Sequence, residues 1–346
     1  MVDIHDSAEQ VLPSGRETLF GAAVAAAVLA GYVWLAGGEA VVRALGQLSP
    51  AWATTLALSG GAPLLIWGVS LWIVFAAIHR RIPVWKAIGL FLASVYLNSV
   101  TPFGQLGGDP PSALLIARES GTSFESGLAA VGSVNALNRL AVVCLGLIGV
   151  AWYTARIAVA QRLQEAVVLV VGLGAIGVAV VAIAWLRRDV VADVLATLLR
   201  ALGSQLPFVE TPSRAATVER IDEFVAAVER LASHPRVLVA AFLLGVAGQV
   251  AVAGVLWLVL VALGVAVPIP FVLLVIPAAK LAGLTPLPGG SGPAEALLSG
   301  LLVTGAEVSV AVAAAAALLY RAVAFWLPTV LGGLLTIAFL LHPSEE

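Results

Sequence analysis

Long apolar runs are the feature that most restricts how this chain can fold. A helix needs roughly 20 apolar residues to cross the ~30 Å hydrocarbon core of a bilayer. Runs of about that length or more lie at residues 18 to 38, 52 to 78, 126 to 153, 165 to 186, 237 to 263 and 307 to 327. Only 11% of the residues are charged, against about 25% in soluble domains. The runs therefore predict an all-α polytopic membrane protein.

Two breaks rich in proline and glycine interrupt the apolar pattern and resemble one another. The first runs from Thr101 to Pro111 (TPFGQLGGDPP) and the second from Thr285 to Glu295 (TPLPGGSGPAE). An arginine follows each break within an apolar stretch and at a similar spacing, Arg139 after the first and Arg321 after the second. Paired broken segments at corresponding positions of two halves are typical of a transporter site near the bilayer midplane.

Charge bias sets the predicted orientation of the runs. Basic residues gather after the second run, at Arg80, Arg81 and Lys86, and again in the polar segment 187 to 236. The positive-inside rule places both regions on the cytoplasmic side of the membrane. We therefore expect a multi-pass protein of the cell membrane with a cytoplasmic N-terminus.

This orientation leaves two segments that begin and end on one side of the membrane. Residues 86 to 125 are predicted to form a re-entrant hairpin of two helices, about Ile88 to Val100 and Ser112 to Ala117. Residues 271 to 304 are predicted to form a second hairpin that enters from the opposite side. The short last run, Thr329 to Leu341, is counted as a further span. The prediction is about seven to eight transmembrane helices plus two re-entrant helical hairpins in an inverted repeat.

The domain organisation follows from the same pattern. Residues 1–17 are a polar N-terminal tail, residues 18–341 a single transmembrane domain and residues 342–346 a C-terminal tail. Within the domain, residues 188–236 form a cytoplasmic connector, and its second half has the apolar spacing of an amphipathic helix. Two interpretations stay open for this helix: a linker on the membrane surface, or a docking site for a cytoplasmic partner enzyme.

A break inside the hydrocarbon core frees backbone N–H and C=O groups, which only protein or a water-filled cavity can satisfy. A helix that begins at such a break directs its positive N-terminal end into the cavity, which suits phosphate or carboxylate groups. Gly107 and Gly108 in the first break, and Gly289 and Gly290 in the second, leave room for a ligand to approach the backbone. The alternative is that these glycines only permit tight turns.

Three basic residues lie away from any predicted loop: Arg139, Lys280 and Arg321. A charged side chain at the centre of a membrane helix costs roughly 2.5–3.5 kcal/mol on insertion scales, so it usually faces a cavity and a partner. One interpretation is a structural ion pair with Asp109 or Glu295. The other is a cationic ligand for a lipid phosphate, whose oxygens match the guanidinium fork of arginine.

Further polar residues surround the first break. Asn135, Asn138 and Arg139 share one helix face, at positions i, i+3 and i+4, and Asn98 and Gln105 flank the break itself. We predict that these residues line the same substrate-binding cavity. Each amide taken alone also fits an interhelical hydrogen bond.

The acidic residues Asp109 and Glu295 stand at the predicted helix starts. They serve either as helix caps, since acidic residues complement the positive end of a helix, or in proton coupling and charge pairing at membrane depth.

Other chemistry is not indicated. The only cysteine, Cys144, lies in an apolar run and the four histidines are scattered, so we expect no metal site. The chain has neither a Walker A sequence nor a serine nucleophile elbow. We therefore expect a protein that is not an enzyme, with no cofactor and no nucleic-acid partner.

The chain resembles the lysylphosphatidylglycerol synthase transmembrane-region family, whose members are also called flippase-like membrane proteins. The resemblance covers roughly residues 15 to 340. It rests on the run TPFGQLGGD with Leu114, Leu115 and Arg118, and on the run PLPGG through Glu295 with Tyr320 and Arg321.

The resemblance implies a flippase-like domain that moves polar-headed lipids between leaflets, such as phospholipids or polyprenyl-phosphate-linked sugars. The implied partners are lipids with anionic head groups and a cytoplasmic lipid-modifying enzyme or glycosyltransferase. The alternative is a non-catalytic scaffold or accessory subunit for such an enzyme. The chain departs from the family's pattern at Ser112, where a basic residue is common, and at Asn138 and Val142, where acids are common. We therefore expect the charge of the cargo to lie near Arg139.

Overall fold

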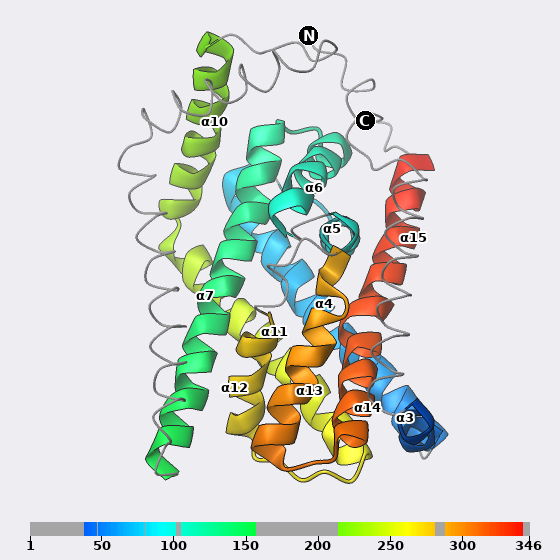
Figure 1. Ribbon diagram of the computed structural model, residues 1–346. Coiled ribbons are helices and arrows are strands. Elements are labelled where there is room, and N and C mark those ends of the chain that lie inside the picture. Colours follow the sequence, from blue (N-terminus) through cyan, green and yellow to red (C-terminus); the bar gives the residue numbers. More distant parts are fainter. Residues whose placement is uncertain are drawn as a thin grey trace.

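The computed structural model describes residues 38–46, 48–79, 81–101, 105–156, 214–280 and 288–341, and within them every regular element is a helix (Figure 1). The elements are α3 (Gly38–Gly46), α4 (Pro50–Ile78), α5 (Val84–Val100), α6 (Gln105–Ser120), α7 (Phe124–Arg156), α10 (Arg214–Ala232), α11 (Pro235–Ala262), α12 (Ile269–Lys280), η2 (Pro288–Gly290), α13 (Pro293–Ala306), α14 (Val310–Arg321), η3 (Ala322–Trp326) and α15 (Leu327–Leu341). The predicted all-α class is confirmed. The runs at 18–38 and 165–186, and the two tails, lie outside the described residues.

Four helices in the described part are long and apolar enough to cross a membrane. They are Pro50–Ile78, Phe124–Gly149, Pro235–Ala262 and Val310–Leu341. The first three correspond to predicted runs, so these predictions are confirmed. A multi-pass membrane protein follows from them.

The fourth span corrects the sequence prediction, which treated 307–327 and Thr329–Leu341 as separate crossings. The structure joins them into one helix through a π turn, in which the Leu327 N–H bonds to the Ala322 carbonyl five residues back. Pro328, one residue later, lacks an N–H and would interrupt an ordinary α-helix. The wider turn lets the helix continue through the proline, as π turns often do at irregular points.

Each break joins two shorter helices into a pair. The first helix pair is α5 with α6, and the second is α12 with α13. The turns that lead from α11 into α12 and from α13 into α14 lie at the lower end of Figure 1, whereas α6 leads into α7 at the upper end. At the upper end, Lys86 and Glu119 form an ion pair of 3.6 Å that ties the start of α5 to the end of α6.

The helix after the first break is longer than the sequence predicts. It begins at Gln105 rather than Ser112, so Asp109 lies in its second turn and is not a cap. The two prolines, Pro110 and Pro111, lie in the second turn of α6, so the carbonyls of Leu106 and Gly107 lack their regular N–H donors there. The Ser112 hydroxyl donates to the Gly108 carbonyl at 2.7 Å, which adds a side-chain hydrogen bond to this turn.

Each helix pair packs against the long helix that follows the other pair. α5 packs along α15, where a Cβ on Gly332 would lie 2.1 Å from the Leu92 carbonyl oxygen. α12 packs along α7, where a Cβ on Gly149 would lie 2.8 Å from the Leu274 nitrogen. Close packing at small residues drives helix association in a bilayer, where the hydrophobic effect between helices is lost. The two halves therefore hold each other reciprocally.

The amphipathic helix α10 packs on the bundle through its apolar face. Val225, Ala227 and Leu231 are buried, against α7 and α4. The Arg230 Nε donates to the carbonyl of Ile78 at 2.9 Å, which caps the end of α4. In Figure 1, α10 runs beside the upper part of α7. The apolar face of this helix is therefore packed on α7 and α4.

Candidate functional site

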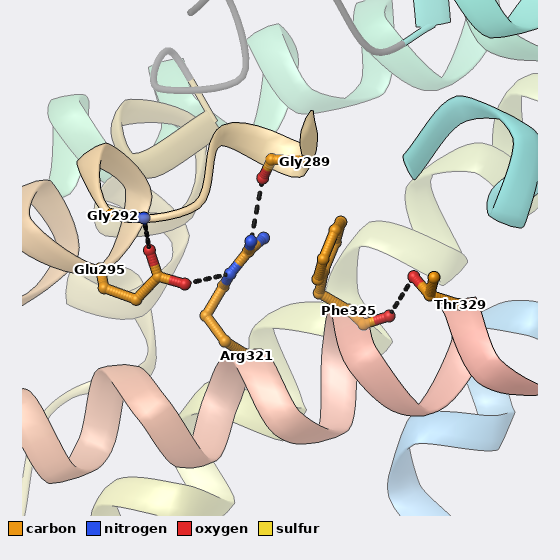
Figure 2. Close-up of polar contacts among 6 residues, drawn as sticks. All are labelled: Gly289, Gly292, Glu295, Arg321, Phe325 and Thr329. Atoms are coloured by element: carbon orange, nitrogen blue, oxygen red, sulfur yellow. Dashed lines mark hydrogen bonds and ion pairs between the residues drawn. The ribbon is translucent and has the colours of Figure 1, made fainter. Parts of the chain in front are cut away.

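The second break is closed by one arginine. The Arg321 Nε donates to Glu295 Oε1 at 2.8 Å, and its Nη2 donates to the Gly289 carbonyl at 2.9 Å (Figure 2). The other carboxylate oxygen, Oε2, accepts from the Gly292 N–H at 2.6 Å, at the start of α13. Glu295 is fully buried and Arg321 is 9% exposed. We call these four residues the Arg321 clamp.

Phe325 completes the Arg321 clamp from one turn away. Its ring lies 3.7 Å from the guanidinium carbon of Arg321, a cation–π stack (Figure 2). The same ring leaves no room for a side chain at Gly289, where a Cβ would lie 2.0 Å from the ring. Gly289 and Gly290 both have left-handed backbone, with φ of 60° and 63°, so the turn itself requires glycine.

The Arg321 clamp contains the ion pair that was one of the two alternatives for this break. The ion pair with Glu295 is present, and Glu295 also stands in the first turn of α13, where it caps the helix as predicted. A lipid phosphate would reach Arg321 only by displacing Glu295 from a buried, hydrogen-bonded position. The second break is therefore better suited to hold the fold than to bind cargo.

The first break carries a looser polar cluster. The Asn135 Nδ2 donates to Asp109 Oδ1 at 2.8 Å. The Asn98 side chain and Arg139 both lie near enough to the Asp109 carboxyl group to stabilise its charge. Asp109 is half-buried and Arg139 is exposed at the surface of the protein. We call these four residues the Asp109 cluster; unlike the Arg321 clamp, it presents its arginine outward.

The two breaks share one spacing. Asp109 bonds to a residue 26 positions later, Asn135, and Glu295 bonds to a residue 26 positions later, Arg321. By its separation from the acid, Arg321 corresponds to Asn135 and not to Arg139, which lies one helical turn beyond Asn135. In the first break the residue bonded to the acid is thus a neutral amide, and Arg139 attracts Asp109 from one helical turn farther along α7.

The glycines of the first break serve the packing of α5 on α6. A Cβ on Gly108 would lie 2.5 Å from the Cα of Asn98. Gly108 is buried and Gly107 is half-buried. Gln105 is the first residue of α6, and its side chain lies outside the described part of the structure.

A third polar group lies between the two helix pairs. The Lys280 Nζ, at the end of α12, donates to Gln249 Oε1 on α11 at 2.6 Å. The same ammonium lies 6.0 Å from the centre of the Trp67 ring on α4. Asn138 of α7 contacts the same helix α11, where a Cβ on Gly245 would lie 2.9 Å from its Oδ1. Sequence reasoning missed Trp67, because a tryptophan in an apolar span is usually a packing residue.

Three buried polar atoms in this region have no hydrogen-bond partner among the described residues: Trp67 Nε1, Asn98 Oδ1 and Asn138 Oδ1. Buried polar groups are normally satisfied, by protein, water or ligand. Asn98 belongs to the Asp109 cluster, whereas Trp67 and Asn138 contact α11 at Gly248 and Gly245, close to the Gln249 that bonds to Lys280. No three His, Cys, Asp or Glu side chains come together as a metal site in the part of the chain that the structure describes.

Comparison with known families assigns the chain. The model of the family described as "Lysylphosphatidylglycerol synthase TM region" matches residues 20–332. The chain belongs to this family. The matched range includes both breaks, Arg139, Lys280 and Arg321, so the resemblance seen in the sequence is confirmed. No curated protein matches the chain.

Proposed function

We propose that this family member is a translocase, a flippase or scramblase, for membrane lipids with anionic polar head groups. Phospholipids and polyprenyl-phosphate-linked sugars are the cargo classes in view, and the protein performs no covalent chemistry on them. The observation that carries the proposal is the contrast between the breaks: Arg139 is exposed beside the half-buried Asp109, whereas Arg321 is sealed by Glu295. The family's description, which names a lipid synthase membrane region, supports lipid as the cargo.

The reciprocal packing supports a transporter architecture. We propose that the two helix pairs are re-entrant hairpins of an inverted repeat, because α5 lies on α15 and α12 lies on α7. The equal spacing from each break acid to its partner supports the same relationship. In transporters of this plan, the two repeats rock about a site near the midplane. The full count of spans, a cell-membrane location and a cytoplasmic N-terminus belong to this proposal.

Arg139 and Asp109 have different roles in the proposed translocation. The Arg139 guanidinium offers a planar fork to the two oxygens of a lipid phosphate. Asn135 and Asn98 lie against the Asp109 carboxylate, which attracts Arg139. A lipid phosphate must therefore compete with this carboxylate for the guanidinium group. The acyl or polyprenyl tails stay in the bilayer beside the exposed apolar surfaces of the helices.

The test uses the purified protein in vesicles of phosphatidylcholine and phosphatidylglycerol. A phosphatidylglycerol probe with a fluorophore on one acyl chain is followed while dithionite reduces the outer leaflet. Arg139→Gln should slow probe movement about ten- to a hundredfold, since a charge-assisted hydrogen bond is worth about 1.5–3 kcal/mol. Arg139→Lys should be intermediate, because lysine keeps the charge but not the fork.

The matched control is Arg236→Gln, at an exposed arginine on the first turn of α11. It should move the probe at the wild-type rate. Normal probe movement by Arg139→Gln would remove Arg139 from the site. Absence of movement by the wild-type protein would overturn the translocase proposal itself.

The second candidate function is a scaffold for a cytoplasmic lipid-modifying enzyme or glycosyltransferase. It is favoured by α10, whose apolar face is packed on the bundle while Glu219, Asp222 and Glu223 are exposed. Such a helix stays attached to the bundle and presents its charged face to a partner protein. Lipid movement by the purified protein without any partner would decide against the scaffold.

A further inference from the structure

Lys280 occupies a different environment from the other charged residues at the breaks. Its Nζ donates to a neutral acceptor, Gln249 Oε1, and lies over the Trp67 ring. Among the described residues, no carboxylate forms an ion pair with it. An ammonium at membrane depth without a counter-ion either attracts an anion or gives up its proton.

The charged groups on the neighbouring helices do not supply that counter-ion. α12 packs against α7, α13 and α11. α7 contributes Arg139 on this side, α13 contributes Glu295, which the Arg321 clamp already holds, and α11 carries only Arg236, at its far end. α4, which contributes Trp67, has no charged residue between Pro50 and Ile78.

The two carboxylates that the sequence offered for proton coupling are both engaged. Glu295 accepts from Arg321 and from the Gly292 N–H, and Asp109 accepts from Asn135. Lys280 has exposed surface beside the Trp67 ring, and a lysine in apolar surroundings, unlike an arginine, can release its proton. Lys280 is therefore a basic group, in the described part of the chain, whose charge can change without breaking an ion pair.

A route for protons to Lys280 is marked by the unsatisfied polar atoms beside it. On α11, Gly245 contacts Asn138, Gly248 contacts Trp67 and Gln249 bonds to Lys280. These positions share one helix face within about 6 Å along the axis. Trp67 Nε1 and Asn138 Oδ1, both without a hydrogen-bond partner among the described residues, are therefore within about a turn of the ammonium. Water molecules satisfy such buried polar atoms and conduct protons between them.

We propose that Lys280 couples the movement of the anionic head group to the movement of one proton. The inference rests on the proposed translocase function. On the acidic side, the Nζ lone pair takes a proton from water, and the ammonium so formed draws the lipid phosphate from Arg139 toward the centre. On the alkaline side the ammonium returns the proton to water, and the neutral amine releases the phosphate. One proton and one head-group charge cross together, so the cycle carries no net charge.

The alternative is that Lys280 only complements the C-terminal end of α12, as basic residues commonly do. Arginine would fill that role equally well. The substitution Lys280→Arg therefore separates the two, because it keeps the charge and cannot release a proton.

The experiment uses the same vesicles and the same fluorescent phosphatidylglycerol probe, with the interior one pH unit more alkaline than the exterior. The wild-type protein should enrich the probe in the inner leaflet, up to about tenfold, the ratio that one proton per head group allows per pH unit. A potassium diffusion potential should not change this ratio. Lys280→Arg should still let the probe cross, but it should leave the two leaflets equal.

Controls and a second variant keep the result interpretable. Lys86→Arg makes the same change at the ion pair with Glu119 and should enrich the probe as the wild type does. Gln249→Glu gives Lys280 a fixed counter-ion and should also abolish enrichment. It replaces Lys280→Arg as the test if that variant does not insert into the membrane. All variants are compared at equal amounts of monodisperse protein.

Each outcome decides something. Enrichment by Lys280→Arg or Gln249→Glu equal to the wild type would overturn the coupling role. Probe movement without enrichment by the wild-type protein would overturn coupling and leave the translocase proposal standing. A wild-type protein that moves no probe would overturn both.

Discussion

Replacing Glu295 by glutamine tests whether the Arg321 clamp holds the fold. Glu295 is fully buried and its oxygens accept from the Arg321 guanidinium and the Gly292 N–H. Glutamine keeps the shape of the side chain but leaves the Arg321 guanidinium without its counter-charge. Its single oxygen cannot accept from both Arg321 and the Gly292 N–H at their present positions, so one of these donors would face an NH₂ group. Removing one partner of a buried ion pair costs about 3–5 kcal/mol. We therefore expect Glu295→Gln to lower the free energy of unfolding by about that amount.

The assay is unfolding in mixed detergent micelles, followed by tryptophan fluorescence. Glu307→Gln is the matched control, an exposed glutamate just beyond the other end of α13, and should stay within about 0.5 kcal/mol of the wild type. The double variant Glu295→Leu with Arg321→Met should be more stable than either single one, because both charges are removed together. A loss below about 1 kcal/mol for Glu295→Gln, or additive losses in the double variant, would refute the structural role of the clamp.

Two further predictions concern the second break and α10. Gly289→Ala should cost at least about 1–3 kcal/mol from its left-handed backbone alone, plus the clash with Phe325, whereas Gly300→Ala, which meets open space, should be neutral or stabilising in the same assay. The pKa of Glu223 is raised above 4.5, first by desolvation and then by the neighbouring Glu125 carboxylate. The folded state therefore binds that proton more tightly, so hydrogen exchange should show α10 held more firmly as the pH falls through the raised value toward 4.5, an effect absent in Glu223→Gln.

The helices and breaks were predictable because they depend on composition over long windows. Runs such as 52–78 and 237–263 can only be helical in a bilayer, since no other backbone satisfies its own polar groups there. Their ends depend on local exceptions. The helix predicted to begin at Ser112 begins at Gln105, with two prolines inside it. The span predicted to begin at Thr329 continues from α14 through a π turn.

The candidate residues were recognisable in the sequence, but their partners were not. Arg139 and Arg321 stand out equally because each is isolated among apolar residues. Only the fold shows that Glu295 reaches Arg321 while Asp109 reaches Asn135, since a contact across 26 residues depends on how the helices pack. The similar spacing from threonine to arginine in the two breaks did not predict which residue each acid bonds to.

The π turn after Arg321 has a mechanical consequence. Arg321 and Gly332 are eleven residues apart, so an unbroken α-helix would place them on nearly the same face. The extra residue of the turn rotates everything beyond it by roughly 100°. Arg321 can therefore grip α13 while Gly332 lies on Leu92 of α5. One continuous helix thereby contacts both helix pairs from different sides, so its position depends on both pairs.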